Sequence, residues 1–197
     1  MKLFKYSMSI IFLVLCSCTT FQNVKLVSLK EKSKEPLPRK AKNILILGIG
    51  STASRIFLDK ATGKLIAGLS KKDVSASYIY LGKSNEDATN NYTKLDFKGD
   101  DLILLITPND ASNYQVFTSR DMNTNYNSNV GYYNTMSVTS TVMYSQQFKL
   151  TLYDVVNDKK QIWSSLLNIE CELGQPRINT IVSDLILAKF KKNMYLP

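Results

Sequence analysis

A continuous apolar run, Asn43–Ile49, restricts the fold more than any other feature of the sequence. A strand with apolar residues at successive positions has no polar face, so it fits a sheet that is covered on both sides. Parallel strands joined by helices are the usual way to cover both sides of a sheet. We therefore expect an α/β chain with this run at the centre of its sheet.

The residues after this run predict a helix and then further strands. Ser51 or Thr52 is a suitable N-cap, and the apolar spacing predicts a helix over residues 52–69. Thr62 and Gly63 lie inside that range and could form a hairpin turn instead. Strands are expected over 76–81 and 101–107, with one or two helical turns over 83–91. This spacing implies a right-handed β–α–β crossover.

The second half of the chain predicts two hairpins and a helix. Residues 109–147 are crowded with Asn, Ser, Thr and Tyr, which predicts a long polar hairpin with its tip at 125–131. A second hairpin follows, in which Trp163 lies on the inward face of the returning strand. The apolar stripe of the last helix consists of Ile178, Ile181, Val182, Leu185 and Ile186.

The size of the chain suits one domain. Its 197 residues, 44% of them hydrophobic, are enough for one buried core and too few for two comfortable ones. We expect a single α/β (α+β) domain over residues 43–197. It would hold a mixed β-sheet with a β–α–β unit, a carboxyl-terminal β-hairpin and a packing helix.

The first 17 residues have the three parts of an export signal. Lys2 and Lys5 form a basic start, an apolar run follows, and small residues lead to a cysteine. The apolar run is much shorter than the roughly 20 residues that a spanning helix requires. Leu15-Cys16-Ser17-Cys18 resembles the lipobox of bacterial lipoproteins, which implies cleavage before Cys18 and acylation of that cysteine by chains such as palmitate. Cys16 is the other candidate, but it would put Leu15 where the family has a small residue.

Residues 18–42 predict a flexible tether. They contain charged residues of both signs and two prolines, Pro36 and Pro38, with few large apolar residues in periodic order. Such a segment cannot offset its ordering entropy by burial. Position 19 is Thr, not the Asp that retains enteric lipoproteins at the inner membrane, so the resemblance implies the outer membrane, facing the periplasm.

The composition narrows the possible chemistry. The chain has no histidine, which excludes Ser-His and Cys-His nucleophile pairs and His-containing zinc sites. Once Cys16 leaves and Cys18 is acylated, Cys171 is the only thiol, and we expect it to be buried and inert. The formal charge of +9 suits an anionic lipid or cell-wall polymer, although it can also serve solubility alone.

The segment from Gly48 to Ala53 matches the G-x-G-x-x-A form of a dinucleotide fingerprint. A cofactor loop of this type needs an acidic residue at the end of the second strand, where this sequence has Leu81-Gly82-Lys83. We therefore expect a tight strand-to-helix turn and no cofactor or metal. The alternative is an enzyme with a nucleotide or phosphate site at this turn, or a carboxylate hydrolase that uses Asp100 and Asp101 or Glu170 and Glu172.

The best candidate contact surface lies in the Asn-rich hairpin. It consists of Arg120, Tyr126, Tyr132 and Tyr133, residue types that supply large contact area at modest entropy cost. An inert exposed loop is the other interpretation. The lysines are scattered along the chain, so we expect no nucleic-acid partner.

The order of elements resembles a known family. A strand–helix–strand–strand series, then Leu152-Tyr153-Asp154, a turn with Lys160, Trp163 and a final helix, is similar to the TolB amino-terminal type of α/β domain. That domain also occurs in the curli secretion lipoprotein CsgG and in penicillin-binding-protein activators. The resemblance covers about residues 43–196. It implies a non-catalytic binding or assembly factor, held on a membrane by lipid, whose partner is an envelope protein or an anionic envelope polymer.

Overall fold

Strand β2 (Asn43–Ile49) pairs in parallel with a strand on each side, β3 (Ser75–Gly82) and β4 (Leu102–Pro108). Its five interior residues are all buried, as expected for a strand covered on both faces. The predicted central strand and its two parallel neighbours are confirmed. Pro108 is the last residue of β4 and pairs with Phe148.

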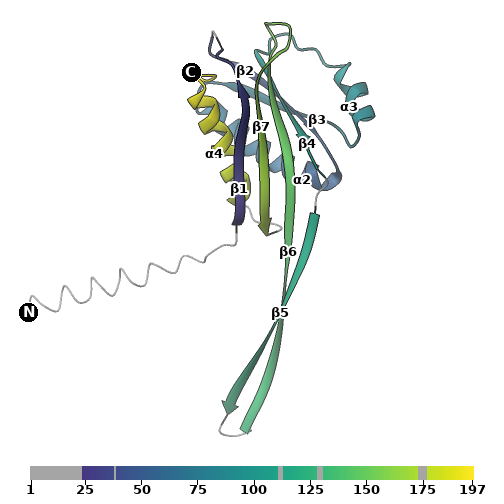
Figure 1. The fold of residues 1–197 in the computed structure, drawn as a ribbon, viewed down its shortest axis with the longest axis vertical. Helices are drawn as coiled ribbons and strands as arrows, with labels where there is room; N and C mark the ends of the chain where they lie inside the picture. The colour runs from purple at the N-terminus through teal and green to yellow at the C-terminus, as the bar shows by residue number, and fades with distance from the viewer. Residues whose placement is uncertain (1–23, 38, 111–112, 128–130, 173–176) are drawn as a thin grey trace, which may run out of the picture.

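The structure, a computed structural model, describes residues 24–37, 39–110, 113–127, 131–172 and 177–197; side chains of 24–26, 113–127 and 131–141 lie outside the description. The remaining strands are β1 (Val24–Lys34), β5 (Asn113–Asn127), β6 (Gly131–Asp154) and β7 (Lys160–Glu172). All the strands form one mixed sheet in the order β1–β7–β6–β4–β2–β3, with β5 paired to β6 (Figure 1). The expected α/β class with a mixed sheet is confirmed.

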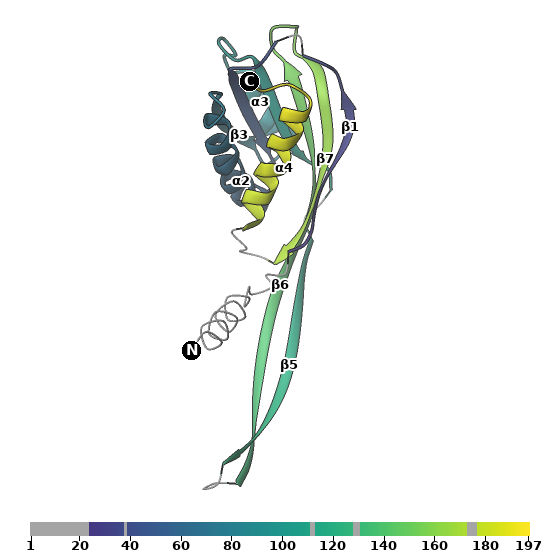
Figure 2. The same ribbon diagram turned by 90° about the vertical axis from the view of Figure 1, so that its left-hand side faces the viewer.

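Helices cover the two faces of the sheet unequally. Helices α2 (Thr52–Ser70) and α4 (Arg177–Lys192) lie side by side on one face, over the main core (Figure 2). The opposite face carries only the short helix α3 (Asn85–Tyr92), over a smaller cluster that includes Leu45 and Leu47 of β2. Helix α3 contacts the edge strand β3, so in the described part of the chain the rest of this second face has no helix over it.

The second hairpin and the last helix close the main core as the sequence predicts. Trp163 of β7 is fully buried, and its ring meets that of Phe190 of α4 edge-on, with centroids 5.5 Å apart. Ile178, Val182 and Ile186 of the predicted stripe are buried, whereas Ile181 and Leu185 are half-buried. The helix over residues 52–69 is also confirmed, with Ser51 as its N-cap, so Thr62 and Gly63 do not form a turn.

The prediction of a flexible tether over residues 18–42 is wrong for the part that the structure describes. Residues 24–34 form the edge strand β1, antiparallel to β7. Val27 and Leu29 pack against the main core, and the next inward residue, Glu31, accepts a hydrogen bond from Trp163 Nε1 at 3.1 Å. An edge strand needs only one apolar face, and the lysines of β1 protect its free edge from pairing with another chain. The composition of such a strand therefore resembles that of a polar linker.

Specific bonds also fix the residues between β1 and β2. Arg39 forms a bidentate pair with the buried carboxylate of Asp154, at 2.6 and 3.3 Å. The Asp101 carboxylate accepts hydrogen bonds from the backbone N–H groups of Lys42 and Asn43 at 2.7 and 2.9 Å. The carboxylates of Asp154 and Asp101 therefore hold this linker on the domain. Both residues lie in later parts of the chain, so the sequence of the linker alone does not show that it is ordered.

Candidate functional site

The most prominent feature of the molecule is a two-stranded arm formed by β5 and the first half of β6. The strands pair from Asn113 with Ser145 to Asn127 with Gly131, and Figures 1 and 2 show that the arm runs away from the body of the domain. Beyond Ser145 the same strand β6 continues into the main sheet between β7 and β4. The predicted polar hairpin is thus an extension of the central sheet.

The predicted contact residues all belong to this arm. The backbone register pairs Arg120 with Val138, Tyr126 with Tyr132 and Asn125 with Tyr133. The three tyrosines therefore lie next to the tip of the arm, and Arg120 lies further back along it. Their side chains lie outside the described part of the structure, so their role as a contact surface stays a prediction.

The first residue of β1 and the root of the arm lie in one row of the sheet. Val24 pairs with Cys171, Cys171 pairs with Tyr144, and Tyr144 pairs with Tyr114. The chain therefore enters the domain at the same end from which the arm leaves it (Figure 1). Cys18, the predicted acylation site, and Cys16 lie outside the described residues.

The turn from Gly48 to Ala53 is packed closely against its neighbours. A Cβ atom on Gly48 would lie 2.8 Å from Tyr78 Oη, and one on Gly50 would lie 2.7 Å from Ser54 Cβ. Ser51 Oγ accepts the hydrogen bond of the Ser54 backbone N–H at 3.3 Å. The glycines accommodate side chains of this chain, which agrees with the tight strand-to-helix turn that we expect.

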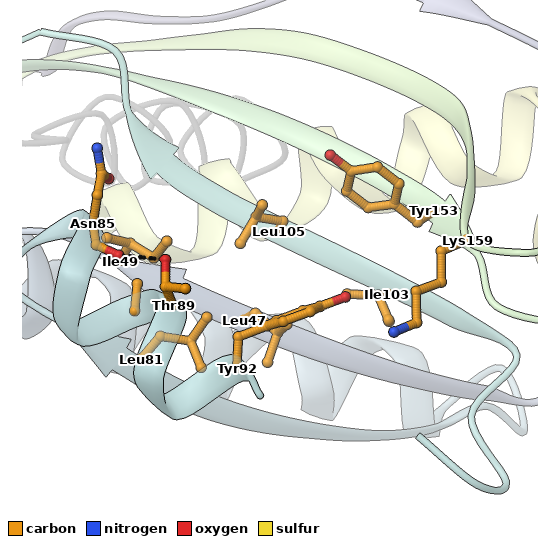
Figure 3. A pocket seen from close by; sticks show the side chains of 11 residues that line it. Leu47, Ile49, Leu81, Asn85, Thr89, Tyr92, Ile103, Leu105, Tyr153 and Lys159 are labelled. Carbon is orange, nitrogen blue, oxygen red and sulfur yellow. Dashed lines mark hydrogen bonds between the residues drawn. The ribbon is translucent and has the colours of Figure 1, made fainter. Parts of the chain in front are cut away.

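A groove lies on the face of the sheet that α3 covers only in part. Its volume is about 430 Å3, and it runs between α3 and strands β2 and β4 (Figure 3). Apolar side chains from all three elements form most of its wall: Leu47, Ile49, Ala88, Tyr92, Ile103 and Leu105. The sequence does not predict this groove, because it arises where a short helix leaves a sheet face exposed. The alternation of Ile103 and Leu105 with inward residues of β4 is its only local signal.

Lys159 is the one charged residue in the wall of this groove. Its ammonium nitrogen lies 4.0 Å from the centroid of the Phe97 ring and 5.2 Å from that of Tyr92. Asp158 and Lys159 have φ angles of 52° and 57°, and the Lys160 N–H bonds to the Asn157 carbonyl, so the turn is of type I′. Glycine or asparagine is usual at such positions, so the lysine is held in a costly backbone conformation.

The remaining candidate groups are the thiol of Cys171 and two pairs of acidic residues. Cys171 is buried, and burial raises the pKa of its thiol, as expected for an inert cysteine. Burial, together with Asp101 and Asp96, raises the pKa of Asp100. The Asp101 carboxylate accepts the hydrogen bonds from the backbone N–H groups of Lys42 and Asn43. Glu170 and Glu172 are half-buried on β7. The structure keeps the two carboxylate pairs apart, at opposite ends of the sheet. Asp100 and Asp101 precede Leu102, which pairs with Asp154, whereas Glu170 and Glu172 pair with Ser145 and Met143 near the root of the arm.

Two general findings apply to the described part of the chain only. No group of three or more His, Cys, Asp or Glu side chains there is arranged to hold a metal ion. Among the helices described, none has the length and apolar character needed to cross a membrane.

Comparison with known proteins gives remote structural similarities. No family model and no curated protein matches the chain. Two structures of a PelC dodecamer from Paraburkholderia phytofirmans have TM-scores of 0.43 and 0.42 at 12% and 11% identity, covering 83% and 86% of this chain and 95% and 98% of theirs. A PDZ domain protein from Parabacteroides distasonis has a TM-score of 0.38 at 12% identity, covering 90% of this chain and 38% of its own.

Proposed function

We propose that this protein is a lipid-anchored envelope protein, held on the outer membrane through Cys18 and facing the periplasm, which acts without catalysis by binding another envelope component. The arm formed by β5 and β6 is the observation that carries this proposal. A two-stranded ribbon outside a core adds little to the stability of a domain. The extension of the central strand β6 beyond the body of the domain is therefore better explained by binding at a distance from the domain than by stability.

Geometry supports a partner at the membrane. Gly131 and Tyr144 are 13 positions apart on β6, and at about 3.4 Å per residue the arm is about 44 Å long. Cys18 and Val24 are six positions apart, so the connection between them spans at most about 22 Å. Because chain entry and arm root lie at the same end of the sheet, an anchored Cys18 would keep the arm within reach of the membrane.

The arm can be tested by site-specific photocrosslinking in cells. A photoreactive amino acid at Tyr126 or Tyr132 should crosslink to an envelope component, whereas the same group at Lys64, exposed on α2, should not. Replacing residues 123–129 with a short Gly-Ser linker should abolish the crosslink from a photoreactive amino acid at Arg120, a predicted contact residue outside the replaced segment, and leave the melting temperature unchanged. Equal crosslinking from Lys64 and the arm would argue against a specific contact surface. Loss of both folding and crosslinking would show that the arm is structural.

The anchor has its own test. Cys18→Ala should stop acylation and lipoprotein-type processing, and Cys16→Ala should not. Mass spectrometry of the mature amino terminus measures both outcomes. An acylated Cys16, or an unmodified residue at the mature terminus, would refute the anchoring proposal. Without the anchor, crosslinks from the arm tip should also be lost, since they depend on the short connection to the membrane.

A further inference from the structure

The groove beside α3 is shaped for an elongated apolar ligand. It follows α3 from Asn85 to Tyr92 (Figure 3), a length of about 12 Å for eight residues at 1.5 Å each. Its volume of about 430 Å3 is within the range of small-molecule sites. Leu105, Ile103 and Ile49 present apolar surface on its floor, and covering that surface is favourable.

The charge in the groove points to an anionic ligand. Lys159 lies at the Tyr92 end, no acidic residue belongs to the wall, and no described carboxylate forms an ion pair with Lys159. The Lys159 ammonium group lies over the rings of Phe97 and Tyr92. Lys159 has a left-handed backbone conformation, which is less costly in free energy for glycine than for lysine. A cation placed at one end of an apolar groove complements an anion on an apolar chain.

We propose that this groove binds an amphiphile with one unbranched alkyl chain and one carboxylate, its chain along α3 and its carboxylate at the Lys159 ammonium group. An extended peptide fits less well. Strands β2 and β4 already pair on both sides, so their backbone groups are engaged and offer a peptide no hydrogen bonds. A peptide would therefore leave its own backbone polar groups unpaired on an apolar floor, whereas an alkyl chain has none.

The head group is tested by calorimetric titration of the predicted mature chain, residues 18–197 carrying Cys18→Ala, which has neither the apolar leader nor the predicted acylation site and so avoids detergent. Decanoate should bind. Decanol should bind about tenfold more weakly, because a charge-assisted contact is lost, and decyltrimethylammonium should not bind. Lys159→Asn, which suits the left-handed turn, should reduce decanoate affinity to that of decanol, while the control Lys64→Asn should not change it. Equal affinity for decanoate and decanol, or no effect of Lys159→Asn, would overturn the proposal.

The location of the site is tested by filling the groove. Thr89 is an exposed residue of α3 in its wall, and Asn90 is an exposed neighbour outside the wall. Thr89→Trp should abolish decanoate binding, and Asn90→Trp should leave it intact, with both melting temperatures within error of the parent chain. Decanoate binding that survives Thr89→Trp would place the ligand elsewhere. Failure of decanoate to bind while an apolar peptide binds in a Thr89-dependent way would identify a peptide groove and refute the amphiphile.

Discussion

Trp163→Ala is the most informative single substitution for the fold, because Trp163 joins three elements. Its indole is fully buried in β7, it meets Phe190 of α4 edge-on, and its Nε1 donates to Glu31 of β1. Truncation leaves a cavity between the sheet and α4, and it also removes a hydrogen bond from a partly buried carboxylate. We expect the free energy of unfolding to fall by about 3–5 kcal/mol.

Urea unfolding measures this change. With a slope of about 2 kcal/mol per molar urea, the midpoint should fall by about 2 M while the slope stays constant. Val156→Ala is the matched control, since Val156 is 68% exposed and a surface truncation should change stability by less than about 0.5 kcal/mol. A loss below about 1 kcal/mol for Trp163→Ala would refute the packing of Trp163 against α4 and β1. A changed slope would mean that the substitution alters the compactness of the unfolded or native state, or that the unfolding is no longer two-state.

Three further outcomes are expected. Gly50→Ala should lower the free energy of unfolding by about 1–3 kcal/mol, because Gly50 has φ +148° and its new Cβ would approach Ser54 Cβ to 2.7 Å; an unchanged urea midpoint would contradict this. Burial raises the pKa of Glu31, but hydrogen bonds from Asn193 and Trp163 and the charges of Lys189 and Lys34 outweigh it, so the net pKa lies below the ordinary 4.5. Its stabilisation is therefore complete above pH 4.5 and is lost as the pH falls through the lowered pKa, and Glu31→Gln should flatten the acid side of the stability–pH curve. Cys171 should react with maleimide in urea but not in the folded protein at neutral pH, as peptide mass spectrometry can measure.

The sequence predicts those parts of the fold in which periodicity and burial agree. The run at β2, the Ser51 cap of α2 and the inward position of Trp163 are each specified by residues close together in the chain. Strand β1 could not be predicted in the same way, because its apolar residues are few and its paired residues in β7 lie 129 to 147 positions later in the chain. Its pairing is decided by Trp163 and the edge of β7, which a local pattern does not contain.

The two candidate sites, the arm and the groove, also differ in how far the sequence predicts them. The Asn-rich composition of residues 109–147 identifies a hairpin, but composition does not reveal that β6 is one strand shared by arm and sheet. The groove is further from prediction, since its walls come from β2, α3 and β4, and Lys159 reaches it from a turn. The alternation of Ile103 and Leu105 with inward residues of β4 is its one local signal in the sequence, because the left-handed conformation of Lys159 is seen only in the structure.

The continuity of β6 links the arm to the rest of the molecule. Residues 148–154 of β6 lie between β4 and β7, and Phe148, Leu150 and Leu152 are fully buried, so this half of the strand is fixed by the main core. The other half has only β5 and, near its root, β7 as partners. Local opening is cheapest where buried apolar contacts are fewest, so the tip should open before the root. A partner that holds the tip would act on a strand whose other end cannot shift its register without exposing those three core residues. The core therefore opposes slippage of β6 along β5, whereas the tip of the arm can open locally.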